Sequence, residues 1–113
     1  NATLLFVTLN KSDKDFSPST QYNDYLINEH YFHWQSQNTD SHQNNGGQRY
    51  TKQADTQNKI ILFVREEKKD GYGNTCPFHC FGLVEYMSSH DDFPMNITWK
   101  LQQPAMAQYV KAI

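Results

Sequence analysis

At the centre of the most informative segment, which runs from Tyr22 to Tyr50, the sequence reads His30-Tyr31-Phe32-His33-Trp34-Gln35-Ser36-Gln37. If these residues form a strand, successive side chains point to opposite faces of a sheet. One face then carries Phe32, Trp34 and Ser36. The other face carries four side chains with polar groups: Tyr31, His33, Gln35 and Gln37. This alternation predicts the recognition edge of a small β-barrel, with aromatic surfaces on one side and hydrogen-bonding groups on the other.

Ten residues in and around this segment are candidates for binding a nucleic acid. Aromatic side chains that offer stacking faces are Tyr22, Tyr31, Trp34 and Tyr50. Polar side chains suited to reading base edges or holding phosphate are Asp24, Gln35, Ser36, Gln37 and Arg49. Arg65, beside the most apolar strand, either binds phosphate or pairs with a carboxylate such as Glu66 or Glu85. For Trp34 and Phe32 the alternative role is core packing, and for the polar face it is simple solvation.

Length and composition favour one small β-rich domain. The chain has 113 residues, of which 37% are hydrophobic and 14% aromatic, so the core is built from few but large side chains. The formal net charge is −2, which argues against a stand-alone, non-specific nucleic-acid binder. That charge still permits a reader with a base pocket, if a neighbouring domain supplies the phosphate contacts.

The ends and the cysteines suggest a domain taken from a larger protein. Asn1-Ala2 is interpreted as a cloning scar, and residues 3–113 as one domain excised from a longer chain. No apolar run is long enough to span a bilayer, so no membrane partner is expected. Two cysteines, Cys76 and Cys80, are too few for a disulfide framework and favour a reduced, cytoplasmic location.

Hydrophobic patterning predicts a mainly β (α+β) fold. Strands are expected over 3–10, 22–27, 31–37, 59–66, 78–88 and 95–102, with a buried first strand and a central fourth one. Residues 11–20 and 38–58 are expected to be loops, with at most a short strand at 48–51. Gly82 predicts a bulge, and residues 105–113 a closing helix. Short spacings between the strands favour a mostly antiparallel, partly open β-barrel with a C-terminal helix.

The sequence offers no catalytic or metal-binding motif. It has no glycine-rich phosphate loop, no helical His pair and no nucleophile elbow. The spacing of Cys76 and Cys80 is not that of a zinc site, and we expect ordinary cysteines there. The domain is therefore expected to be no enzyme and to need no cofactor and no metal.

Several motifs resemble one bacterial domain along nearly the whole chain. They are Lys11-Ser12, Phe16 to Tyr25, Phe32 to Gln37, Gly47 to Tyr50, Leu62 to Glu66, Gly73-Asn74-Thr75, Phe81-Gly82, Tyr86, Ser88, Pro94-Met95, Ile97 and Trp99-Lys100-Leu101. The chain is similar to the uncharacterised C-terminal domain of bacterial superfamily-two (DEAD/DEAH-type) helicases that also carry a phospholipase-D-type nuclease domain. Its expected architecture also resembles the PUA-like barrels, which include the SRA, YTH and EVE readers of modified bases. The segment Cys76 to Cys80 departs from the helicase-associated pattern.

The resemblance implies an accessory domain of a restriction-type, ATP-dependent helicase. We expect it to bind DNA and to read a modified base, in which case alanine at Trp34, Gln35 or Arg49 weakens binding. A module that docks on the helicase or nuclease domain of its own chain is the alternative, and the acidic balance favours it. A small metal-dependent nuclease is a third interpretation.

Overall fold

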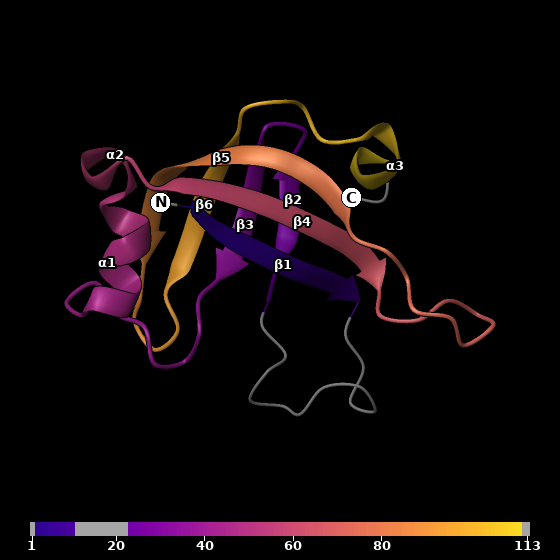
Figure 1. Ribbon diagram of the computed structural model, residues 1–113, viewed down its shortest axis with the longest axis horizontal. Helices are drawn as coiled ribbons and strands as arrows, with labels where there is room; N and C mark the ends of the chain where they lie inside the picture. The colour runs from indigo at the N-terminus through magenta and orange to yellow at the C-terminus, as the bar shows by residue number, and fades with distance from the viewer. Residues whose placement is uncertain (1, 11–22, 112–113) are drawn as a thin grey trace.

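The computed structural model describes residues 2–10 and 23–111, and within them a single sheet of six strands is formed (Figure 1). The strands are β1 (Ala2–Asn10), β2 (Tyr25–Asn28), β3 (Tyr31–Gln35), β4 (Lys59–Glu67), β5 (His79–His90) and β6 (Asn96–Leu101). The helices of the described part are short: α1 (Asn45–Thr51), α2 (Gln53–Thr56) and α3 (Ala107–Val110). Across the sheet the strand order is β1-β4-β5-β6-β3-β2.

The sheet is mixed, although antiparallel pairing dominates as predicted. The neighbouring pairs β4–β5, β5–β6, β6–β3 and β3–β2 are all antiparallel. The pair β1–β4 is parallel, with Phe6 opposite Phe63. The spacing argument did not anticipate this pair, because the two strands are separated in sequence by β2, β3 and the first two helices. β1 is consequently an end strand of the sheet, not the fully buried strand that its composition predicted.

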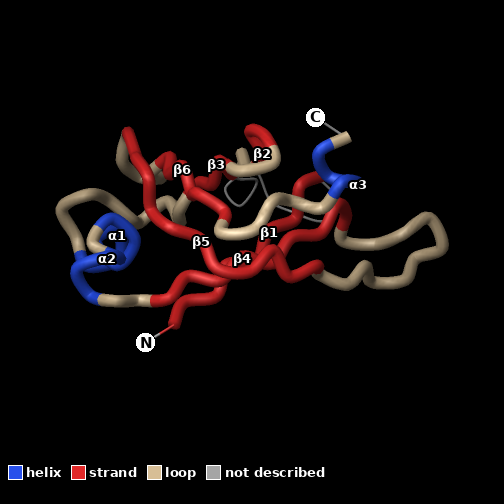
Figure 2. The backbone as a smooth tube through the Cα atoms, turned by 90° about the horizontal axis from the view of Figure 1, so that it is seen from above, coloured by secondary structure: helices blue, strands red, loops and turns tan. Residues whose placement is uncertain are grey.

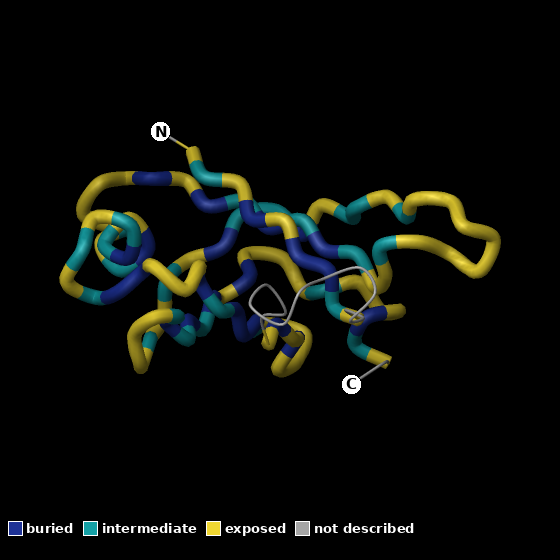
Figure 3. The backbone as a smooth tube through the Cα atoms, turned by 90° about the horizontal axis from the view of Figure 1, so that it is seen from below, coloured by how far each residue is buried: buried dark blue, intermediate teal, exposed yellow. Residues whose placement is uncertain are grey.

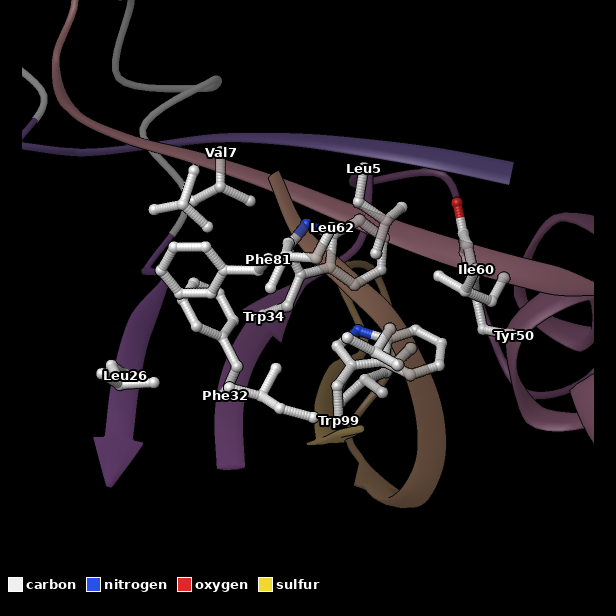
Figure 4. Packing of buried hydrophobic residues seen from close by; sticks show 14 of the residues in the cluster. Leu5, Val7, Leu26, Phe32, Trp34, Tyr50, Ile60, Leu62, Phe81 and Trp99 are labelled. Carbon is white, nitrogen blue, oxygen red and sulfur yellow. The ribbon is translucent and has the colours of Figure 1, made fainter. Parts of the chain in front are cut away.

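The sheet curls into a half-barrel, and its concave side holds the core (Figure 2). Along β4, Ile60, Leu62 and Val64 are fully buried and alternate with partly exposed residues, so one face of the strand points inward. Figure 4 shows side chains of β1 and β4 facing those of β2 and β3 across the interior. The mainly β, barrel-like class with a short C-terminal helix is thus confirmed.

Helices close the two ends of the half-barrel (Figure 1). At one end, α1 begins after Asn44, whose side chain accepts a hydrogen bond from the Gly47 backbone N–H at 2.9 Å, and it buries Tyr50. At the other end, α3 buries Tyr109, whose hydroxyl donates to the Val64 carbonyl at 3.3 Å. The loop between β4 and β5 projects beyond the body and is exposed over most of its length (Figure 3).

Gly82 makes the bulge that the sequence predicted. The pairing of β4 with β5 shifts between Leu62 opposite Gly82 and Phe63 opposite Cys80, which leaves Phe81 as the extra residue. Gly82 has a φ of 84°, which favours glycine. The shift turns Phe81 inward, where its ring packs 5.0 Å from the Tyr109 ring.

Two predicted boundaries are wrong. Residues 38–58 contain α1 and α2 where a long loop with a short strand was expected. Gly46-Gly47 suggested a loop, but these glycines lie against Asp40 and Ser41, where a Cβ would clash, and so allow α1 to start there. The closing helix also begins later than predicted, at Ala107, because the backbone of Met106 is extended, with a φ of −59° and a ψ of 142°. The loop expected at 11–20 lies outside the described residues.

Candidate functional site

β3 has the face pattern that the sequence predicted, but its aromatic face belongs to the core. Phe32, Trp34 and Ser36 are all buried. The Trp34 and Tyr50 rings meet edge to face with centroids 5.0 Å apart, and Tyr50 also packs against Trp99 at 6.1 Å. Burial raises the pKa of the Tyr50 hydroxyl, the Arg49 charge lowers it in part, and the Asp40 carboxylate adds a smaller rise. Two of the four predicted stacking rings, those of Trp34 and Tyr50, are therefore covered by other side chains.

Asp24 and Ser36, predicted as base-reading groups, support the backbone. The Asp24 carboxylate accepts from the Gln35 backbone N–H at 2.9 Å, and the Ser36 hydroxyl accepts from that of Met95 at 2.9 Å. Both residues are buried. Tyr22 lies outside the described residues.

The polar face of β3 forms a closed hydrogen-bond network with β6. The Gln35 amide donates to Asn96 Oδ1 at 3.0 Å, and its oxygen accepts from the Asn23 backbone N–H at 2.6 Å. His33 contacts the Asn23 carbonyl through Nδ1 at 2.9 Å and Asn96 Oδ1 through Nε2 at 3.1 Å. The Tyr25 ring covers His33 in a stacked arrangement. Tyr31 on the same face is half-buried, and Gln37 beyond the strand is exposed.

The two arginines predicted to bind nucleic acid lie on different elements, Arg49 on α1 and Arg65 on β4. Arg49 on α1 is exposed, and its guanidinium lies 5.0 Å from the Tyr50 ring centroid. Arg65 projects from the outer, convex face of β4. Its Nε donates to Thr8 Oγ1 at 2.9 Å, and its guanidinium lies 4.3 Å above the Phe78 ring. Of the nine predicted residues that the structure describes, Trp34 and Arg49 both meet Tyr50, and Asp24 meets Gln35, but these nine residues do not form one common site.

A cavity of about 380 Å³ lies between α2 and β5, which the sequence analysis did not find. Its wall includes Gln53, Gln57, Asn58, Lys59, Tyr86 and Gln102. Gln53 donates from its amide nitrogen to the Val84 carbonyl at 3.1 Å and accepts from the Tyr86 backbone N–H at 2.8 Å. The concentration of amides at 48–58 was a visible signal, but it was interpreted as loop composition.

A second unpredicted feature is an apolar surface on the convex side of the sheet, which we call the outer apolar face. It consists of Leu4, Phe6, Ile61, Phe63, Phe78 and Leu83. Phe6 stacks on Phe63 at 4.9 Å and meets Phe78 edge to face at 5.3 Å. Leu4 and Phe6 are nevertheless 50% and 58% exposed. Exposed apolar side chains that touch one another are typical of interaction surfaces.

Cys76 and Cys80 are both free thiols. Within residues 2–10 and 23–111, no three His, Cys, Asp or Glu side chains are grouped closely enough to bind a metal ion. In the same residues, no helix has the length and apolar character that crossing a membrane requires.

The comparisons with known proteins give a family but no described activity. No curated protein and no solved structure matches the chain. One family model matches residues 1–112, which is nearly the whole sequence. The chain therefore belongs to the family described as a domain of unknown function, DUF3427.

Proposed function

We propose that this chain is an accessory nucleic-acid-binding domain of a larger bacterial DNA-processing protein of the helicase type. In this proposal the cavity between α2 and β5 takes up one unstacked base. The observation that carries the proposal is the wall of the cavity, where several side-chain amides surround about 380 Å³ of space. The motifs that resemble the helicase-associated domain favour the same function.

The chemistry of the cavity suits a heterocyclic base. Amide side chains donate and accept hydrogen bonds side by side, as the edge of a base does. Within the described residues, nothing hydrogen-bonds to the side chains of Gln57 or Gln102, so both amides are available to a ligand. Leu83 and Val84 supply apolar wall, against which the faces of a base can lie.

The charges around the cavity suit a few phosphate contacts. Lys59 is exposed and lines the cavity, and Lys52 directly precedes α2. Arg49 lies one helical turn before Lys52. Glu85 is a carboxylate in the same wall as Lys59 and offsets part of this positive charge. With so few cations we expect a shallow salt dependence, with a logarithmic slope of about −2 to −3.

The test is a fluorescence-anisotropy titration of single strands and of matched duplexes that contain plain, methylated or hydroxymethylated cytosine. We expect one probe class to bind measurably more tightly at moderate salt, because a base inside a pocket adds affinity that salt does not screen. Equal affinity for all probes, or no binding to any of them, would count against the base pocket.

Variants locate the site. Alanine at Gln102 and at Gln57 should each weaken the preferred probe by about 3- to 10-fold, as expected for the loss of one hydrogen bond. Lys59→Ala should weaken all probes alike and lower the salt slope by about 1. Lys111→Ala is the charge-matched control, because Lys111 is exposed next to α3 at the other end of the half-barrel.

A second candidate function is docking on another domain of the same polypeptide, and the outer apolar face favours it. Phe6 and Leu4 are half exposed or more although their chain neighbours Leu5 and Val7 are buried, so β1 is apolar on both faces. An end strand without a charge between residues 3 and 10 is unusual for a surface that faces only water.

The docking function is separated from nucleic-acid binding by a different variant. Phe6→Glu should abolish binding of this domain to a separately produced helicase or nuclease domain of its parent protein, measured by calorimetry. The same variant should leave the oligonucleotide titration unchanged, because Phe6 is not part of the cavity wall. Heat release that is equal for wild type and variant would rule out the outer apolar face as the contact surface.

A further inference from the structure

Four side chains near the β5–β6 turn form a hydrogen-bonded chain, and only its last member, Tyr86, also belongs to the cavity wall. The Asp92 carboxylate lies 2.8 Å from His42 Nδ1, and His42 Nε2 lies 2.7 Å from Ser89 Oγ. Ser89 Oγ in turn lies 2.6 Å from the Tyr86 hydroxyl. A carboxylate, an imidazole and a serine hydroxyl thus follow one another in the order used by hydrolases with a serine nucleophile.

The network determines which ring nitrogen of His42 carries the proton. Asp92 Oδ1 also accepts from the His42 backbone N–H at 2.8 Å, so two bonds from one residue fix the carboxylate. A carboxylate only accepts, hence Nδ1 carries a proton and donates it. In the neutral ring, Nε2 is then a bare acceptor that faces the Ser89 hydroxyl. These bonds also keep the Asp92 pKa below its usual value, chiefly through the His42 backbone N–H.

The backbone on both sides of Asp92 is strained. Asp91 has a φ of 62° and Phe93 a φ of 54°, and only one other non-glycine residue of the described chain has a positive φ. Such conformations are costly for residues other than glycine and are common where a side chain must be aimed at a reacting group. The loop that carries His42 is held there too, because the Phe93 backbone N–H donates to the Asp40 carbonyl at 3.0 Å.

Reagents have access to the cluster. The His42 and Asp92 side chains are 36% and 43% exposed, and Ser89 is partly exposed. Phe93 on the same turn is 62% exposed and offers an apolar surface for a substrate chain. The four hydrogen-bonded side chains are thus accessible to solvent, whereas the hydrogen bond between Ser36 and Met95 is buried.

We propose that Ser89 is an activated nucleophile that accepts the acyl group of carboxylic esters, with His42 as its general base and Asp92 as the group that orients His42. This activity goes beyond the proposed nucleic-acid binding and does not depend on it. Tyr86 donates to Ser89 Oγ in this arrangement and turns the Ser89 proton toward His42.

The reaction consists of two proton-balanced halves. Ser89 Oγ bonds to the ester carbonyl carbon while its proton passes to His42 Nε2. His42 then gives that proton to the departing alkoxide as the ester C–O bond breaks, which leaves an acyl-serine and an alcohol. Water from the solvent repeats the sequence on the acyl-serine: His42 takes its proton, the hydroxide releases the carboxylic acid, and Ser89 regains its proton.

The test is reaction of the whole chain with a fluorophosphonate probe, followed by peptide mass spectrometry. Oγ displaces fluoride from such a probe and retains the phosphonate, so one adduct on Ser89 is expected. The matched control is Ser88, an exposed neighbour on the same strand that has no contact with His42. Ser88→Ala should be labelled as the wild type is, and Ser89→Ala should not be labelled.

The dependence on the two partners tests the assigned roles. His42→Gln and Asp92→Asn should each lower the labelling rate by at least about 100-fold while their melting curves stay cooperative. The proposal is overturned if the wild type stays unlabelled where a serine hydrolase reacts fully, or if Ser88 is labelled equally. It is also overturned if both variants keep the wild-type labelling rate but melt earlier, because the cluster would then serve only to fasten the His42 loop to the turn.

Discussion

The two halves of the convex face of the sheet differ in how their side chains are satisfied. In one half, on β3 and β6, the polar side chains of His33, Gln35 and Asn96 bond to one another and to the Asn23 backbone. In the other half, on β1, β4 and β5, lies the outer apolar face, where Phe6 stays largely exposed. A row of hydrogen-bonding residues is therefore weak evidence for recognition, because such residues also satisfy one another. A row of exposed aromatic residues has no such internal solution.

The largest expected effect of breaking this contrast is on the polar half. His33→Ala removes the two hydrogen bonds of the imidazole ring and its stacking contact with Tyr25. It also leaves the Asn23 carbonyl without its partner. We expect the free energy of unfolding to fall by about 2–3 kcal/mol, measured by urea denaturation. Tyr31→Ala on the same face is the control, because Tyr31 is only half-buried. Equal losses from both variants would show that the network adds no stability of its own.

Arg65 borders the outer apolar face through its contact with Phe78, and its replacement should have a smaller effect. In Arg65→Lys the fork that bonds Thr8 and the Cys76 carbonyl is lost, together with the flat contact on Phe78. We expect a loss of about 1 kcal/mol in the same denaturation experiment. A lysine variant as stable as the wild type would mean that the guanidinium bonds are replaced fully by water.

Phe6 should matter least for stability and most for association. Because its ring is 58% exposed, Phe6→Ser should change the free energy of unfolding by only about 0.5 kcal/mol. The same change should lower the binding of an apolar fluorescent dye, since Phe6 joins Phe63 and Phe78. Unchanged dye fluorescence would place the dye-binding surface elsewhere on the chain.

The smallest effect is expected from acid. Hydrogen bonds to the backbone lower the pKa values of Asp70 and Asp92 below the usual 3.8. A lowered folded-state pKa adds stability that is present above the unfolded-state value and is lost as the pH falls through the folded-state value. Asp92→Asn and Asp70→Asn should therefore each flatten the decline in melting temperature below pH 3.8. Parallel declines in both variants and wild type would contradict the assignment to Asp92.

Much of the fold was predictable from the sequence, because alternation along single strands is a local property. The faces of Phe32 and Trp34 and the bulge at Gly82 both follow from such patterns. The parallel pair β1–β4 was not predictable in this way, because it depends on which distant edge remains free. The prediction of a loop at Gly46 and Gly47 failed for a similar reason. These glycines lie in α1 because Asp40 and Ser41 approach them too closely for a side chain to fit.

The candidate sites were harder to predict than the fold. Nothing in the sequence around Tyr50 shows that its ring meets Trp34 and Trp99, so it was as good a stacking candidate as an exposed tyrosine. The cavity joins residues from α2, β5 and the segment after β6, and His42 meets Ser89 and Asp92 across nearly half the chain. The cavity and the His42 cluster each join segments that are far apart in the sequence. Predicting them therefore requires the complete topology of the fold.

The amide of Gln53 occupies the place of a missing strand. β4 pairs with β5 as far as Ile60 opposite Val84, and beyond that point Gln53 gives the Tyr86 N–H the acceptor that a neighbouring backbone would supply. The amide nitrogen of Gln53 also donates to the Val84 carbonyl. That same side chain is part of the cavity wall. A molecule that enters the cavity therefore contacts the side chain that holds the Tyr86 N–H. The rate at which the Tyr86 amide exchanges its hydrogen for deuterium should then change when the cavity is occupied.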